Sequence, residues 1–157
     1  MKFAMVSDAQ FNGKITSASG NVFDWVWVLH GDHFWIHDIK KDMSALEGYD
    51  AIMLIDVSRW LDEALEMIKT VGNPKFIFYP EGGDKVYFSM PYEHQKKFFE
   101  LLKVVDLVGC VDENMVEFYR ALTDTRVEFI YVPIVEFVTD NSFCRDRISK
   151  NDNVLVC

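Results

Sequence analysis

Four acidic residues follow apolar segments of this 157-residue chain, and each segment has the composition of a β-strand. The four are Asp8, Asp56, Glu81 and Asp112. In a parallel sheet the residues just after each strand converge on one edge, where open α/β folds bind their ligands. The four acids are therefore candidate site residues, with Asp8, Asp56 and Asp112 in substrate binding.

Helix capping is the alternative explanation for these acids, because aspartate is a favoured N-cap and needs no ligand there. It applies best to Asp112 and, less strongly, to Asp56. Asp8 and Glu81 are harder to explain in this way, since each borders a loop that contains glycine.

The segment after the fourth predicted strand, Tyr-Pro-Glu-Gly-Gly-Asp, is the second place where chemistry is expected. Gly82 and Gly83 accept backbone dihedrals that other residues avoid, so this loop can approach a substrate closely. Glu81 is then a candidate general base for a hydroxyl group. A turn with solvated acids is the alternative.

The loop at residues 8–20 contains Gly13 and Gly20 but matches neither the dinucleotide-binding nor the P-loop pattern. The histidines do not form H-E-x-x-H, and a zinc site at His33 and His37 has little support. No serine lies in a G-x-S-x-G setting, and the three cysteines form no C-x-x-C pair. The sequence thus predicts no cofactor and no metal site.

Alternation of strand-like and helix-like segments predicts β-α-β units on a mostly parallel sheet, that is, an α/β, Rossmann-like three-layer domain. Several of the strand-like segments are apolar throughout, as strands covered on both faces must be. The predicted strands are residues 3–6, 34–39, 51–55, 75–79, 107–111 and 127–132.

Helices are expected between these strands wherever apolar residues recur at helical spacing. One carries Leu61 and Ile68, with Ser58 as its N-cap and Gly72 at its end. A second starts at Pro91, and Asp112 caps a third. Residues 22–29 are a further predicted helix. The domain is expected to span residues 1–139, and residues 140–157 a linker with the start of a possible second domain.

The composition is that of a globular protein, because half of the residues are apolar and 26% are charged. The formal charge of −9 disfavours binding to nucleic acid, whose phosphates would be repelled. No apolar segment is long enough to cross a bilayer and no signal peptide is visible, so a cytoplasmic location is expected.

Residues 105–134 resemble the closing portion of the N-terminal domain of a GT-B glycosyltransferase. In that family a strand of the form D-x-V-x-x-V-S is followed by a helix, a short polar turn and a strand ending in V-x-x-x-P. The matching residues are Asp106, Val108 and Val111, and then residues 127–133. Asp112 stands where serine is usual. The first two thirds of the chain agree with the family only in the order of strands and helices.

The resemblance implies that this chain is the acceptor-binding half of an enzyme that uses a nucleotide sugar. The sugar acceptor would bind here, whereas the nucleotide sugar would be held mainly by a C-terminal domain. Gly13 would lie near the cleft, and Glu81 would be a base or an acceptor contact. Such a half is expected to be inactive alone.

Three other functions remain open. A phosphorelay receiver could use Asp8 and Asp56, but the chain lacks the second acid beside Asp8 and the Lys-Pro after the fifth strand. An Mg²⁺-dependent hydrolase or nuclease could use Asp8, Asp56 and Glu81 as oxygen ligands. A non-catalytic α/β binding module would need none of these roles.

Overall fold

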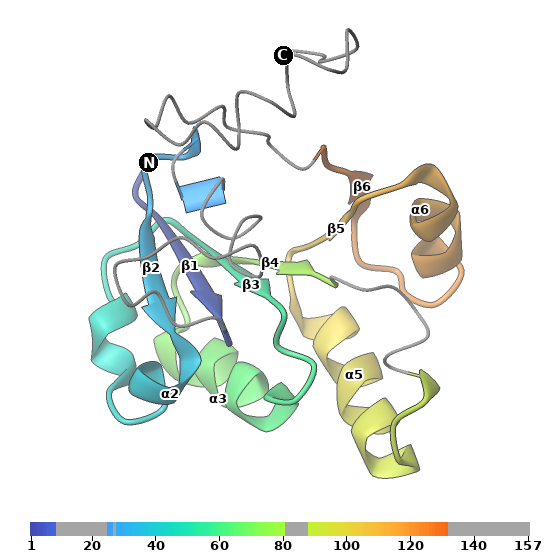
Figure 1. Cartoon of the computed structure of the whole chain (residues 1–157), viewed down its shortest axis with the longest axis horizontal. Coiled ribbons are helices and arrows are strands. Elements are labelled where there is room, and N and C mark those ends of the chain that lie inside the picture. The colour runs from blue at the N-terminus through green and yellow to red at the C-terminus, as the bar shows by residue number, and fades with distance from the viewer. Residues whose placement is uncertain (9–24, 27, 81–87, 132–157) are drawn as a thin grey trace, which may run out of the picture.

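The computed structural model of the chain describes residues 1–8, 25–26, 28–80 and 88–131 (Figure 1). These residues contain a sheet of six strands in the order β2-β1-β3-β4-β5-β6, and every neighbouring pair is parallel. The strands are β1 Phe3–Ser7, β2 Asp32–Trp35, β3 Ala51–Ile55, β4 Lys75–Tyr79, β5 Leu107–Cys110 and β6 Val127–Phe129. The predicted α/β class is therefore confirmed.

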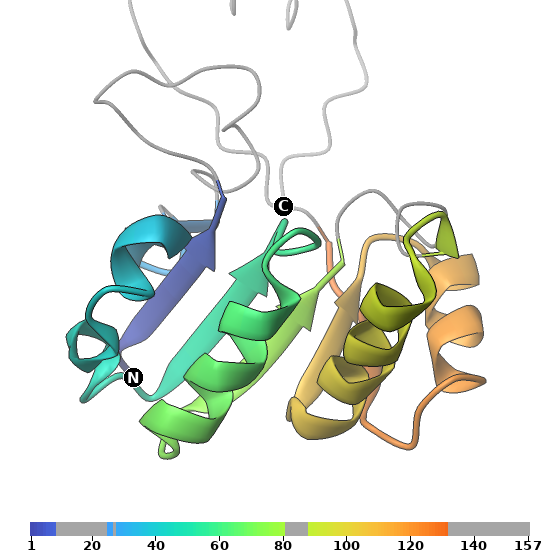
Figure 2. The ribbon, with the colours of Figure 1, turned by 90° about the horizontal axis from the view of Figure 1, so that it is seen from below.

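One face of the sheet is covered by the helices, which lie in front of the strands in Figure 2. They are α2 Ile36–Ile39, the 3₁₀ helix η1 Met43–Leu46, α3 Leu61–Val71, α5 Tyr92–Val104 and α6 Glu113–Arg120. Strand residues such as Val6, Leu54 and Phe78 pack against Leu65 of α3 and Leu101 of α5. This is the larger of two cores in the described residues.

The opposite face carries the second core, in which Met5, Ile55 and Tyr79 are buried. Trp25 packs here and meets the Tyr79 ring edge-on, with the ring centroids 5.8 Å apart. Residues 25, 26 and 28 are helical, in agreement with the predicted helix at 22–29; the other residues of that prediction lie partly outside the described ranges. Helical residues thus lie on both faces of the sheet.

The order of the strands shows that the chain reverses its direction of progress across the sheet at β1: β2 lies on one side of β1, and β3 to β6 lie on the other. Between β1 and the edge strand β2, Trp25 packs on one face of the sheet, and between β2 and β3 the residues of α2 and η1 pack on the other face. Because parallel crossovers are right-handed, opposite directions along the sheet require opposite faces. The connections after β1 and β3 therefore diverge, which makes the carboxyl ends of these two strands the topological switch point.

Strands β3 and β4 have the predicted bounds, and β1 and β5 agree to within one residue. The strand predicted at 34–39 is wrong in extent, because β2 covers Asp32–Trp35 and the chain then turns into α2. Ile36 and Ile39 are buried one helical turn apart against the core, a spacing that a strand could not place on one face. The strand predicted at 127–132 is also too long, because β6 covers Val127–Phe129 and residues 130 and 131 are not in a strand. Residue 132 and the proposed linker at 140–157 lie outside the described residues.

Of the four residues predicted to begin or end a helix, three do so in the structure. Gly72 follows α3 with φ 64°, a conformation that suits glycine, and Pro91 is the N-cap of α5. Asp112 caps α6 by accepting a hydrogen bond of 2.8 Å from the Met115 amide. The prediction for Ser58 is wrong, because α3 begins at Leu61 with Trp60 as its N-cap.

Asp112→Ala should lower the free energy of unfolding by about 1 kcal/mol, the usual contribution of an N-cap side chain. Asp112→Asn should retain most of the stabilisation by the cap, because an amide oxygen also accepts a hydrogen bond from the Met115 N–H. Urea denaturation measures both variants. Asp124→Ala, at an exposed loop aspartate, is the control and should change stability by less than about 0.5 kcal/mol. Equal stability of Asp112→Ala and Asp124→Ala would contradict the capping role.

Candidate functional site

The carboxyl ends of β1, β2 and β3 form one corner of the sheet edge, at the switch point. Ser7, the last residue of β1, lies in register with Trp35 of β2 and with Ile55 of β3. Asp8 and Asp56 directly follow β1 and β3, so the fold brings these two predicted site residues to adjacent strand ends. We call Asp8, Trp35, His37, Asp56 and Trp60 the switch-point corner.

An acid and an imidazole face each other in this corner. Asp8 Oδ1 lies 3.4 Å from His37 Nε2, and their side chains are 27% and 35% exposed. The distance is longer than that of a strong N–H···O hydrogen bond, so both groups retain capacity for a further partner. Their exposure means that a ligand from solvent can reach them.

His37 is held in place by two tryptophans. The ring centroid of Trp35 lies 4.3 Å from that of His37 at a tilt of 38°, and the Trp60 centroid lies 4.3 Å away at 69°. The two tryptophans come from the end of β2 and from the β3–α3 connection, so two segments pack against one imidazole. Such packing restricts the rotamer of His37 and directs Nε2 toward Asp8.

The indole Nε1 atoms of Trp35 and Trp60 are buried and have no hydrogen-bond partner within the described ranges. A buried donor without an acceptor costs about 1–3 kcal/mol. Both donors are thus enclosed by the packing of this corner.

Ser7 and His33 form a second, more buried pair next to this corner. Ser7 Oγ and His33 Nε2 are 2.8 Å apart and share a hydrogen bond whose donor depends on the imidazole tautomer. Ser7 is fully buried. Burial lowers the pKa of His33 to about 4, because the charged imidazolium loses hydration there. At neutral pH this imidazole is uncharged.

Asp56 adopts a left-handed backbone conformation with φ 52° directly after β3. Aspartate tolerates this region better than most residues, although it still costs energy there. The side chain is exposed at the same edge as Asp8. The conformation turns the chain sharply away from the sheet and toward Trp60.

Asp112 lies at this edge too, but farther from Asp8. It follows β5, which β4 separates from β3, so two strand spacings of about 4.8 Å each lie between the ends of β3 and β5. The predicted site residues Gly13, Glu81, Gly82 and Gly83 lie outside the described residues.

No group of three His, Cys, Asp or Glu side chains that could hold a metal ion occurs in the described part of the chain. Cys110, the free cysteine within it, is buried in β5. Burial, assisted by the nearby Asp112 charge, raises the pKa of its thiol to about 12. The protonated thiol is a core group and a poor metal ligand.

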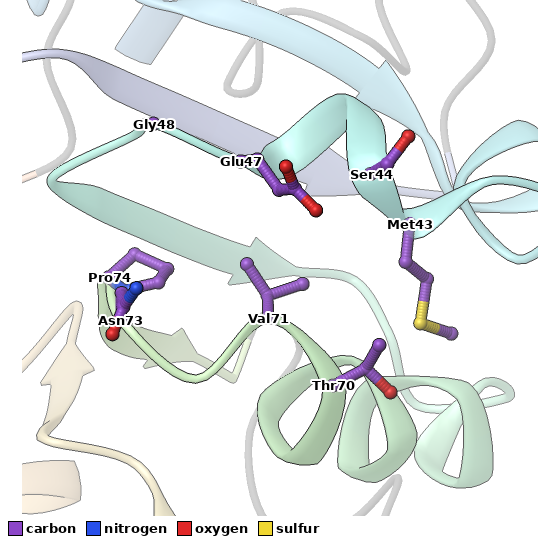
Figure 3. Close-up of a pocket in the computed structure, with 8 residues that line it drawn as sticks. All are labelled: Met43, Ser44, Glu47, Gly48, Thr70, Val71, Asn73 and Pro74. Atoms are coloured by element: carbon purple, nitrogen blue, oxygen red, sulfur yellow. The ribbon is translucent and has the colours of Figure 1, made fainter.

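A hollow of about 310 Å³ lies at the opposite edge of the sheet, near the amino ends of β3 and β4 (Figure 3). Of its lining residues only Glu47 is ionisable. The lining residues are Met43, Ser44, Glu47, Gly48, Thr70, Val71, Asn73 and Pro74. In parallel sheets ligands bind at the carboxyl ends of the strands, so this hollow is the weaker candidate.

Comparisons with protein-family models and with curated proteins found no significant match to the chain. None of the helices in the described ranges has both the length and the apolar character needed to span a membrane.

Sequence reasoning placed Asp8 and Asp56 at the correct edge but gave no role to Trp35 or Trp60. It considered His33 and His37 only as a zinc pair. The indication available in the sequence was the cluster of aromatic residues and histidines at 33–37, next to a predicted strand end. Its partners Asp8 and Trp60 come from distant segments, so spacing alone could not reveal the contacts.

The partly buried His33 should make stability depend on pH. Its folded pKa of about 4 lies below the ordinary value of 6.5, so the unfolded chain takes up a proton first as the pH falls. The free energy of unfolding should therefore decrease from about pH 6.5 toward about pH 4. In urea denaturation across this range, His33→Gln should show a smaller decrease than the wild type.

His94→Gln, at an exposed histidine of α5, is the matched control and should keep the wild-type slope. Equal slopes for His33→Gln and the wild type would contradict a neutral, partly buried His33.

Proposed function

We propose that this domain is the acceptor-binding half of a nucleotide-sugar-dependent GT-B glycosyltransferase. The observation that carries the proposal is the partly exposed Asp8–His37 pair at the switch point of a parallel sheet. Hydroxyl groups of a sugar acceptor are donors and acceptors at once, and a carboxylate beside an imidazole offers both complementary partners.

The resemblance at residues 105–134 supports the same proposal. That stretch covers β5, α6 and β6, so the strand, helix and strand expected by the family pattern occur in this order. Asp112, which replaces the usual serine, acts as the cap of α6, a role that serine fills equally well. The departure from the family pattern therefore preserves the local structure.

Each candidate residue has a role in this proposal. Asp8 and Asp56 bind acceptor hydroxyls at the ends of β1 and β3. Glu81, two residues after β4 in the sequence, is the candidate base that removes the proton of the attacking hydroxyl. Gly13, Gly82, Gly83 and Asp112 complete the proposed acceptor-binding set. The nucleotide sugar binds mainly to a second domain, so this domain alone should not transfer sugar.

The test is sugar transfer by the longest protein that the reading frame encodes. Nucleotide sugars are offered with a panel of sugar acceptors, and the glycoside product is detected by mass spectrometry. Glu81→Gln should reduce the rate by about 10²–10⁴-fold, the usual contribution of a general base, with an unchanged circular dichroism spectrum.

Glu93→Gln, which removes an exposed carboxylate of α5, is the control and should leave transfer unchanged. Unchanged turnover of Glu81→Gln would reject the role of Glu81. Mg²⁺-dependent phosphoester hydrolysis without any glycoside product would reject the transferase proposal itself.

A further inference from the structure

We propose that Trp35, His37 and Trp60 form an aromatic platform that binds a neutral sugar ring of the acceptor. The inference rests on the proposed function and specifies its substrate class. Sugar rings expose C–H groups on their faces and hydroxyls on their rims, so they require apolar surface and hydrogen-bonding groups side by side. The switch-point corner offers both.

The apolar part of the platform is a cluster of three rings, in which the Trp35 ring is tilted by 38° and the Trp60 ring by 69° to the His37 ring. His37 lies between Trp35 and Trp60 at 4.3 Å from each, and each of the three side chains is only partly buried. The rings belong to the continuous β2–α2 stretch and to the β3–α3 connection, which pack together in the fold, so the surface is prearranged and needs little ordering when a ligand binds.

The polar part consists of the Asp8–His37 pair. Asp8 and His37 are both accessible, and their 3.4 Å separation leaves each with capacity for a ligand hydroxyl.

The charges of the corner favour a neutral ligand. Asp8 and Asp56 are acidic, and the chain carries a formal charge of −9. Lys40, whose ammonium lies 5.2 Å above the Trp60 ring, is already paired with Glu63 at 3.3 Å. A phosphate group would therefore meet two carboxylates beside a neutralised lysine, whereas a hydroxyl-bearing ring meets no such repulsion.

The experiment is a ¹⁹F NMR titration of the chain labelled with 5-fluorotryptophan. The sequence has four tryptophans, and Trp35→Phe and Trp60→Phe assign the resonances of the platform. The probes are methyl glycosides of glucose, galactose, mannose and N-acetylglucosamine, with uridine as the comparison. Trp25 is an internal control, because it packs on the opposite face of the sheet.

At least one glycoside should shift the Trp35 and Trp60 resonances saturably, with a millimolar dissociation constant, and leave Trp25 unmoved. His37→Gln should weaken this binding at least tenfold with an unchanged melting temperature. Tyr92→Ala, which removes an exposed aromatic ring from α5, should not affect it. The wild-type titration is decisive by itself if a variant fails to fold.

Shifts with uridine alone, or no saturable shift with any glycoside, would overturn the platform. Sugar transfer by the longest protein together with unmoved Trp35 and Trp60 resonances would leave the transferase proposal standing and reject only the platform. Glycoside binding at the platform without use of any nucleotide sugar would reject the transferase proposal and leave the platform standing.

Discussion

The parallel pairing of β1 with both β2 and β3 is the constraint on which the rest of this structure depends. All five residues of β1 are buried, so the strand has to be covered on both faces. Just before β2, the chain passes close to β1 at Gly31, where a Cβ atom would lie 2.9 Å from the Phe3 carbonyl oxygen. A side chain there would push the β2 edge away, so the pairing of β2 depends on glycine at this position.

This pairing also creates the candidate site. Because β2 and β3 flank β1 and the connections after β1 and β3 leave toward opposite faces, the strand ends meet where no helix covers both. Polar groups can be placed there without interrupting either core. Asp8, His37 and Asp56 occupy this corner, whereas the buried Ser7–His33 pair lies behind it. The exposed pair is suited to bind a ligand, and the buried pair is suited to hold β1 and β2 together.

Several elements could be predicted because their determinants are local. Strands β3 and β4 consist of short apolar segments bounded by turn residues, and their bounds were predicted without error. The N-cap of α6 could be predicted because residue 112 is an aspartate, a favoured N-cap residue. The strand predicted at 34–39 was wrong in extent because the aromatic and aliphatic residues of this segment suit a strand and a helix equally well. Its conformation is decided by burial of Ile36 and Ile39 against the neighbouring elements.

The sequence by itself determined the fold class and the edge of the sheet at which acids gather, because hydrophobic period and strand-end position are local properties. Only the tertiary structure decided which groups touch. The contacts of His37 with Asp8 and with Trp60 join segments far apart in the chain. Such contacts depend on strand order and register, which spacing along one sequence does not specify.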